Sequence, residues 1–293
     1  MLEPNALVAV MDMRCTAPRS TTGPERLVPC HEMVFVRRGV FVTHVGRRHR
    51  IVADATNVLC MDGGLAVRYS HPTDDGDSYT AIGLSEGAVR ELLARHTPRR
   101  AESAECALPA AHVMVTPAMT LRLHRLRATH ADADAGRLGA EEAALALADD
   151  VLRAARAAHG PVREPRRAGT RRTRRELAEH VRLLLAGDVG AATSLADLAA
   201  ATGASPFHLA RTFQAEVGLP IHQYRIRLRL ALALDRLAGG ETSLSALGHD
   251  LGFSSHSHFT HAFRIAFGGA PSDVRRTLTA RVHARLRSAV GIR

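Results

Sequence analysis

Apolar and polar positions alternate in short segments through the first third of the chain. The region 28–84 is covered by segments such as MVFVRRGVFVTHVG, RIVADATNVLCMDGG and LAVRYSHPTDDGDSYTAIGLS, which mix β-branched residues with turn residues. Glycines at positions 39, 46, 63, 64 and 76 separate these runs at intervals typical of hairpins. The pattern predicts a small antiparallel β sandwich or barrel.

From about residue 86 the apolar positions recur every three or four residues. GAVRELLAR, AMTLRLHRLRATH and GAEEAALALADDVLRAAR show this spacing, which predicts helices. These helices follow a β region and precede a linker, so pairing between subunits and packing onto their own sheet are both open. The stretch GPVREPRRAGTRRTRR at 160–175 combines proline, glycine and arginine and predicts a basic linker.

Beyond the linker the same helical pattern occurs twice. Leu195, Leu198 and Gly203 recur 49 positions later as Leu244, Leu247 and Gly252, while Phe213 and Gly218 recur 50 positions later as Phe263 and Gly268. Each copy has a short helix, a turn containing glycine, and a second helix opened by serine, with Pro206 at a first helical position. We therefore expect two helix-turn-helix units joined by a helix over 221–237.

The charge is distributed unevenly between the two halves. The net charge is +10 without a single lysine; residues 1–160 hold 19 arginines and 19 acidic residues, and the rest hold 20 arginines and 10 acidic residues. A basic domain attached to a neutral one indicates a polyanionic partner. The four cysteines form no Cys-x-x-Cys pair, and no export signal or long apolar run is present. We expect a cytoplasmic protein with reduced thiols, no cofactor and no membrane partner.

The second copy carries three histidines in six positions, which raises the question of a metal site. His256 and His258 are about 200° apart on a helix and cannot share an ion. His258 and His261 can, but no cysteine or carboxylate lies close in sequence to complete the shell. With Phe259 and Phe263 in the core, the opposite face is predicted to meet DNA through His256, Ser257, Thr260, His261 and Arg264.

The first copy divides its second helix in the same way. Leu209 and Phe213 face the core, and the other face consists of Phe207, Ala210, Arg211 and Gln214. Arg211 is the best candidate for a base contact, since an arginine forks onto guanine O6 and N7.

The layout of residues 175–277 resembles the AraC/XylS family of transcription regulators. LGFSSHSHFTHAFRIAFGGAPSDVR is similar to the family signature of a Gly-Phe turn, a serine-rich helix start, Phe-x-x-x-Phe and Gly-x-x-Pro. The resemblance implies that Phe207, Ala210 and Arg211 occupy contact positions of the first reading helix, and His256, Ser257, Thr260 and His261 those of the second. Family members commonly carry Gln where His256 stands and Arg where His261 stands.

The resemblance extends diffusely to the β-rich half, which is similar to the cupin-like sensing domains of such regulators. It implies a homodimer that binds operator DNA, acts on transcription with RNA polymerase, and responds to a small-molecule effector, without being an enzyme. The expected fold class is an α+β multidomain chain: a β-rich cupin-like barrel or sandwich with flanking helices at 1–115, a dimerising helical segment at 116–159, the linker at 160–173, and an all-α double helix-turn-helix domain at 174–280.

Three other readings compete with sequence-specific DNA binding. A metal-dependent cupin enzyme would need clustered histidines, whereas His31, His44, His49 and His71 are scattered in the sequence. A metal- or thiol-sensing regulator would bring Cys30, His31, Cys60 and His71 together inside the β domain. A nonspecific DNA clamp would bind phosphates alone, with a steep salt dependence and no preferred site.

Overall fold

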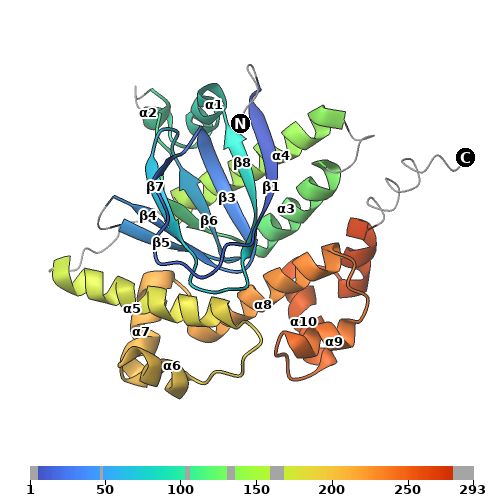
Figure 1. The fold of residues 1–293 in the computed structure, drawn as a ribbon. Coiled ribbons are helices and arrows are strands. Elements are labelled where there is room, and N and C mark those ends of the chain that lie inside the picture. Colours follow the sequence, from blue (N-terminus) through green and yellow to red (C-terminus); the bar gives the residue numbers. More distant parts are fainter. Residues whose placement is uncertain (1–5, 47–48, 103–105, 131–135, 159–167, 280–293) are drawn as a thin grey trace, which may run out of the picture.

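Two antiparallel sheets form the N-terminal half of the protein. The computed structural model describes residues 6–46, 49–102, 106–130, 136–158 and 168–279. The larger sheet has the order β1 (Val8–Cys15), β8 (Asp77–Leu84), β3 (His31–Arg38), β6 (Asn57–Met61) and β9 (His112–Met114). The smaller has the order β2 (Arg26–Leu27), β7 (Ala66–Ser70), β4 (Phe41–Val45) and β5 (His49–Ala53). Within the described ranges no strand of one sheet pairs with a strand of the other, so the β region is a sandwich (Figure 1).

Strand β3 shows how the alternation of the sequence builds two cores. Val34 and Val36 face the smaller sheet and pack with Phe41 between the layers. Met33 and Phe35 point to the opposite face, into a second cluster that includes the helices. Because successive side chains of a strand alternate in direction, this strand has to be apolar on both faces. The continuous run MVFV is therefore explained by burial on two sides.

Helices cover the outer face of the larger sheet (Figure 1). They are α1 (Glu86–His96), α2 (Pro98–Ala101), α3 (Pro117–His130) and α4 (Gly136–Ala158). Leu126 of α3 and Leu147 of α4 are buried in one cluster with Phe35 of the sheet. The apolar faces of α3 and α4 thus pack onto their own sheet, and dimerisation through this segment stays a prediction.

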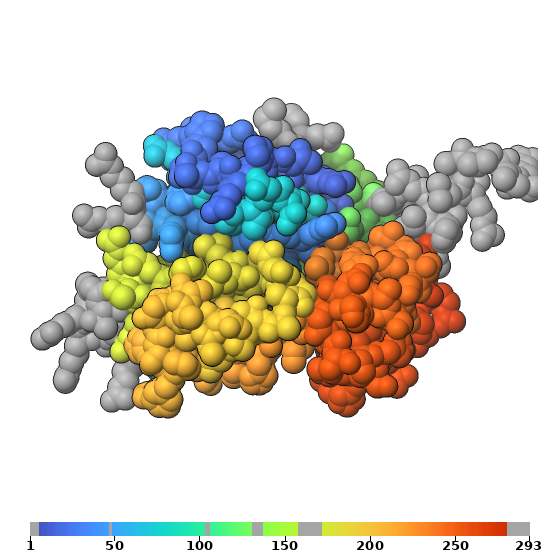
Figure 2. All heavy atoms as spheres, turned by 60° about the horizontal axis from the view of Figure 1, so that its bottom comes forward, coloured from blue at the N-terminus to red at the C-terminus, as the bar shows by residue number. Residues whose placement is uncertain are grey.

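The C-terminal half is helical, as predicted. It contains α5 (Ala168–Gly187), α6 (Leu195–Thr202), α7 (Pro206–Val217), α8 (Ile221–Ala238), α9 (Leu244–Asp250) and α10 (His256–Phe267). Residues 168–173 of the predicted linker belong to α5, and residues 160–167 lie outside the described ranges. Figure 2 shows the α5–α7 part and the α9–α10 part as two neighbouring lobes below the β region. None of the helices described is long and apolar enough to cross a membrane.

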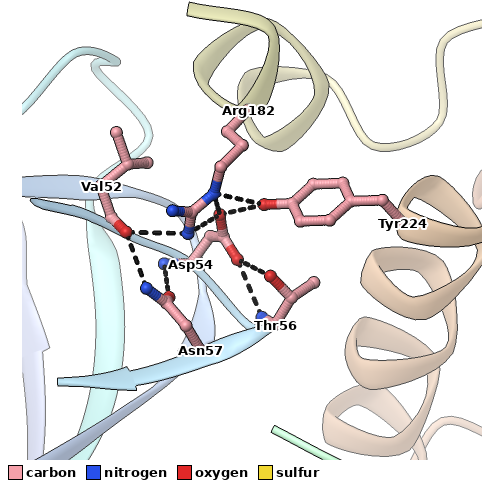
Figure 3. Close-up of polar contacts among 6 residues, drawn as sticks. All are labelled: Val52, Asp54, Thr56, Asn57, Arg182 and Tyr224. Atoms are coloured by element: carbon pink, nitrogen blue, oxygen red, sulfur yellow. Dashed lines mark hydrogen bonds and ion pairs between the residues drawn. The ribbon is translucent and has the colours of Figure 1, made fainter. Parts of the chain in front are cut away.

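A buried ion pair joins the first lobe to the smaller sheet (Figure 3). Arg182 of α5 donates from Nη2 to the Asp54 carboxylate and to the carbonyl of Val52, both at 2.8 Å. The Tyr224 hydroxyl of α8 donates to the same carboxylate and accepts from Arg182 Nε at 2.9 Å. The other carboxylate oxygen accepts from the amide and hydroxyl of Thr56. Burial acts to lower the pKa of the Arg182 guanidinium, but Asp54 and Tyr224 together outweigh burial, so the pKa is raised.

Apolar packing surrounds this ion pair. Val42 and Val52 of the smaller sheet and Val40, just before β4, share a cluster with Phe213 and Tyr224 of the helical half. The β region and the first lobe therefore have a common core. Inside it, both carboxylate oxygens of Asp54 and the Nε and Nη2 atoms of Arg182 are hydrogen-bonded. Removing either charge would therefore leave the other buried without its partner.

A second polar contact reaches the start of the other lobe. Arg37 of β3 donates to Asp235 of α8 at 3.0 Å, and Arg127 of α3 lies 3.6 Å from the same carboxylate. His124 is buried beside them. Burial lowers the pKa of His124 to about 4, although Asp235 acts in the opposite direction.

We expect His124 to make the protein less stable in mild acid. The unfolded chain takes up this proton near pH 6.5, whereas the folded chain takes it up only near pH 4. The unfolded state therefore binds more protons in this window, and stability present above about pH 6.5 is lost as the pH falls, by about 3 kcal/mol at pH 4. Urea unfolding of the His124→Gln variant should show a smaller loss between pH 7 and 4.5. The exposed His180→Gln variant serves as control, and a slope unchanged by His124→Gln would contradict the prediction.

Candidate nucleic-acid interface

The first helix-turn-helix unit is built by local capping. Ser194 and Asp197 cap the start of α6 reciprocally, through the Ser194 hydroxyl and the Asp197 carboxylate. Gly203 then ends α6 in the left-handed conformation, at φ 66°. Ser205 accepts from the amide of His208 and begins α7, with proline at the first helical position. These caps fix the turn, because backbone groups left free at the starts of α6 and α7 and at the end of α6 are hydrogen-bonded.

The second unit repeats this construction with small differences. Ser243 caps α9 and Ser255 caps α10, each by accepting an amide hydrogen bond. Gly252 lies in the turn at φ 74°. Phe259 and Phe263 of α10 are fully buried, with ring centroids 5.8 Å apart. These aromatic contacts hold α10 against α8 and α9.

One buried arginine connects the two units. Arg229 of α8 donates to the carbonyls of Val189 at 3.0 Å and Ala191 at 3.0 Å, both in the segment before α6. It also donates to the carbonyl of Gly252, in the turn of the second unit, at 2.7 Å. Burial, together with the neighbouring Arg225, lowers the pKa of this guanidinium. The sequence pattern of α8 gave no sign of this role, because Arg229 is one of several arginines in alternation with apolar residues.

Most of the predicted contact residues lie on the exposed faces of α7 and α10. Exposed side chains are Phe207, Arg211, Gln214, His256, Ser257, His261 and Arg264, and those of Ala210 and Thr260 are half-buried. Leu209 and Phe213 are buried, as the pattern predicted. Phe207 is 72% exposed, which is unusual for an aromatic side chain.

Two local contacts restrict the outward side chains. The Arg211 guanidinium lies 5.4 Å from the centre of the Phe207 ring, in a cation–π arrangement. On α10, Thr260 Oγ1 and His256 Nε2 are 3.4 Å apart. Both pairs are spaced four residues apart on one helix face. An exposed cation–π contact of this kind contributes about 0.5–1 kcal/mol to the stacked orientation of Arg211.

The three histidines of α10 are directed to different surroundings. His258 Nδ1 is 3.0 Å from the Ser254 hydroxyl, and its ring meets the edge of Phe253 at 5.4 Å. His258 and His261 line a cavity of about 450 Å³ between α10, α8 and the β region, whereas His256 does not. Within the described ranges no group of three metal-ligating side chains includes any of the three. The contact of His256 and His261 with DNA stays a prediction.

The four residues of the alternative thiol and histidine site, Cys30, His31, Cys60 and His71, do not form one cluster in the structure. His31 Nδ1 lies 3.1 Å from the Asp62 carboxylate. Cys60 of β6 is buried in the core between the larger sheet and the helices that cover it. His71 meets Cys15 instead, at 3.9 Å. Cys15 lies 56 residues from His71 in the sequence, and only the sheet topology brings the two together.

Comparisons with known proteins agree with the position of the two units. A family profile described as a helix-turn-helix domain matches residues 198–277. A protein of Streptomyces lividans named as an AraC-like transcription regulator is 35% identical over 83 residues, which make up 28% of this chain and 27% of that protein. The transcriptional activator RhrA of Rhizobium meliloti is 37% identical over 89 residues, or 30% of this chain and 28% of RhrA. The chain thus spans about a quarter of the length of these curated relatives.

A weak likeness to solved structures extends along most of the chain. An apo ToxT variant from Vibrio cholerae aligns with a TM-score of 0.40 and 13% identity, covering 94% of this chain and 100% of ToxT. The family profile falls on the helices whose turns and buried phenylalanines were described above. The C-terminal part of this chain is a helix-turn-helix domain of the AraC type.

Proposed function

We propose that this protein is a sequence-specific transcription regulator that reads two adjacent major-groove segments with α7 and α10. The observation that carries the proposal is the pair of capped, outward-facing helices held on one central helix. At 1.5 Å per residue, the 18 residues of α8 span about 27 Å, which is close to the roughly 34 Å of one DNA turn. Two reading helices mounted in this way can enter the same side of a duplex.

Charge supports contact with phosphates around the two reading helices. The C-terminal 133 residues carry all of the net positive charge. Arg174 on α5 and Arg264 on α10 are exposed, and an exposed arginine near a reading helix is suited to the DNA backbone. Arg225 and Arg229 are excluded from this role, because they donate to carbonyls within the domain.

We further propose that a small molecule modulates DNA binding by this protein. One cavity of about 450 Å³ lies between α10 and the β region, and another of about 500 Å³ lies between the two sheets. Both are of a size that holds a small organic ligand. A ligand in the first would contact the helix that carries His261, so its binding and DNA binding would be coupled. Operation as a homodimer and action with RNA polymerase belong to the same proposal.

Replacing Arg211 by Ala is expected to weaken binding to the preferred operator by about 1–3 kcal/mol, or roughly 5- to 150-fold. The loss should be accompanied by relaxed selectivity at one base pair, because only one bidentate contact is removed. Affinities for the operator and for single-base variants, measured by fluorescence anisotropy at one salt concentration, test this.

The control removes the same charge elsewhere. Arg95 is exposed on α1, a helix that lies on the far side of the β region from α7 (Figure 1). Arg95→Ala should leave both affinity and selectivity unchanged. An equal loss on every sequence in Arg211→Ala would instead assign Arg211 to the phosphates.

Selection from randomised duplex DNA with the full chain tests the function itself. Two enriched motifs about one helical turn apart are expected at near-physiological salt. Binding without an enriched motif, fading only as salt rises, would identify a nonspecific clamp.

A further inference from the structure

Three side chains with complementary chemistry meet at the cavity between the two sheets. Cys15 Sγ lies 3.9 Å from His71 Nε2, and His71 Nδ1 lies 3.0 Å from Asp77 Oδ2. The sheet topology produces this arrangement, since Cys15 and Asp77 are partners in the ladder of β1 and β8. A bridge between Ser20 and His71 places the imidazole beside them. All three side chains line the cavity.

The order of the atoms distinguishes two kinds of chemistry. The carboxylate lies against Nδ1, and the thiol lies near Nε2, on the other edge of the ring. One ligand atom from each of the three residues lies within 4.8 Å of the others, a spacing that a metal ion could bridge, but the carboxylate is hydrogen-bonded to Nδ1, on the ring edge opposite the sulfur. A thiol, a base and a group that orients the base need this linear order. The geometry therefore favours an activated thiol over a metal centre.

Burial adds a second observation at the carboxylate. Asp77 is almost completely buried, and its Oδ1 has no hydrogen-bond partner among the described residues. Burial raises the pKa of Asp77, and His71 opposes this. An unsatisfied buried carboxylate oxygen is costly, and a positive charge on the hydrogen-bonded His71 ring would offset part of that cost.

The cavity itself is suited to a small apolar molecule. It measures about 500 Å³ and is lined by apolar side chains that include Met11, Met13, Phe41 and Tyr79. Pockets of this size and character hold organic ligands rather than hydrated ions.

We propose that Cys15 is a modification site for small α,β-unsaturated carbonyl compounds bound in this cavity. The Cys15 thiol transfers its proton to His71 Nε2, and Asp77 orients the resulting imidazolium. The sulfur then forms a bond to the β-carbon while the carbon–carbon π bond breaks and its electron pair moves toward the carbonyl oxygen. His71 returns the proton to the α-carbon. The product is a thioether, and no oxidant, reductant or further reactant is consumed.

The other cysteines provide internal comparison. Cys60 and Cys106 are buried, and Cys30 is half-buried at the end of the loop before β3. Burial raises the pKa of all three thiols, to about 12 for Cys60, and Glu32 adds to the effect at Cys30. Cys30 is thus the matched partially accessible thiol that lacks a histidine relay.

The test is the rate at which N-ethylmaleimide, itself an α,β-unsaturated carbonyl compound, modifies each cysteine of the full chain at pH 7 with EDTA present. Peptide mass spectrometry should find Cys15 modified at least about 10-fold faster than Cys30, since an ordinary thiol is only about 3% ionised at this pH. His71→Gln and Asp77→Asn should each slow Cys15 by about 10-fold and leave Cys30 unchanged. A Cys15 rate no faster than that of Cys30, or no effect of His71→Gln, would overturn the proposal.

A pH profile of the unaltered protein covers the case in which these variants do not fold. Between pH 8 and 6 the Cys30 rate should fall about 10-fold per pH unit, and the Cys15 rate should fall less steeply. The charged groups facing Cys15 and His71 across the cavity are Asp77, Glu32 and Arg26, together with the Tyr79 hydroxyl. Equal slopes would overturn the proposal, as would one equivalent of Zn²⁺ that is retained through gel filtration and blocks Cys15. DNA takes no part in these measurements, so their outcome is independent of the proposed function.

Discussion

Replacing Arg182 by Met is expected to lower the free energy of unfolding by about 3–5 kcal/mol. The substitution removes the cation but keeps most of the apolar length of the side chain. It leaves the Asp54 carboxylate fully buried, with the Tyr224 hydroxyl and Thr56 as its remaining donors. Most of the expected loss is the cost of that uncompensated charge and of the Val52 carbonyl that loses a donor. Urea unfolding at pH 7, followed by circular dichroism, measures it.

A matched control lies on the same helix. Arg172 pairs with Glu176 on the exposed face of α5, so Arg172→Met should leave the urea midpoint nearly unchanged. The double variant Arg182→Met with Asp54→Asn should recover part of the loss, because neither charge then remains buried. Similar midpoints for Arg182→Met and Arg172→Met would show that the buried pair contributes no more than a surface pair.

The second large effect is expected at the turn between α9 and α10. Gly252→Ala should lower the free energy of unfolding by about 4 kcal/mol, from about 1–2 kcal/mol of left-handed backbone strain and the remainder from overpacking. An added Cβ would overlap the Gly190 carbonyl oxygen and the Arg229 guanidinium. Because Arg229 bonds both units, the variant should also bind the selected operator more weakly. Urea unfolding and anisotropy on the same preparation measure the two effects.

The internal repeat supplies the control for this prediction. Gly203 occupies the equivalent turn of the first unit with nearly the same φ, and a Cβ there meets no atom within 4 Å. Gly203→Ala should therefore cost only the strain, about 1 kcal/mol. Equal losses in the two variants would mean that crowding at Gly252 relaxes freely and that Arg229 does not hold the turn.

Local patterns explain why the helical half could be predicted from sequence. The glycines at 203 and 252 and the phenylalanines at 213 and 263 determine turns and buried faces within a dozen residues of each other. Caps such as Ser205 and Ser255 act on amides three positions away. Such short-range effects leave a readable spacing, and the placement of the outward residues follows from it.

Polar contacts between residues far apart in the chain produce no comparable sequence pattern. Arg182 and Asp54 are 128 residues apart, and nothing in either neighbourhood distinguishes them from other charged residues. The sequence pattern does not indicate strand β1, since Val8–Cys15 mixes half-buried and exposed positions and includes Asp12. Without β1 in the sheet, Cys15 could not be placed near His71. The start of α5 inside an arginine-rich stretch was missed because charge density alone does not break a helix.

The bonds of Arg229 have a consequence for the DNA rather than for the protein. Because one side chain holds the segment before α6 and the turn before α10 together, the two reading helices keep a fixed separation and angle. One base pair inserted between the half-sites would turn the second by about 35° and move it by about 3.4 Å. The protein could then follow only by bending the duplex or by releasing one half. The length of the spacer should therefore discriminate among genomic sites as strongly as the bases that the helices touch.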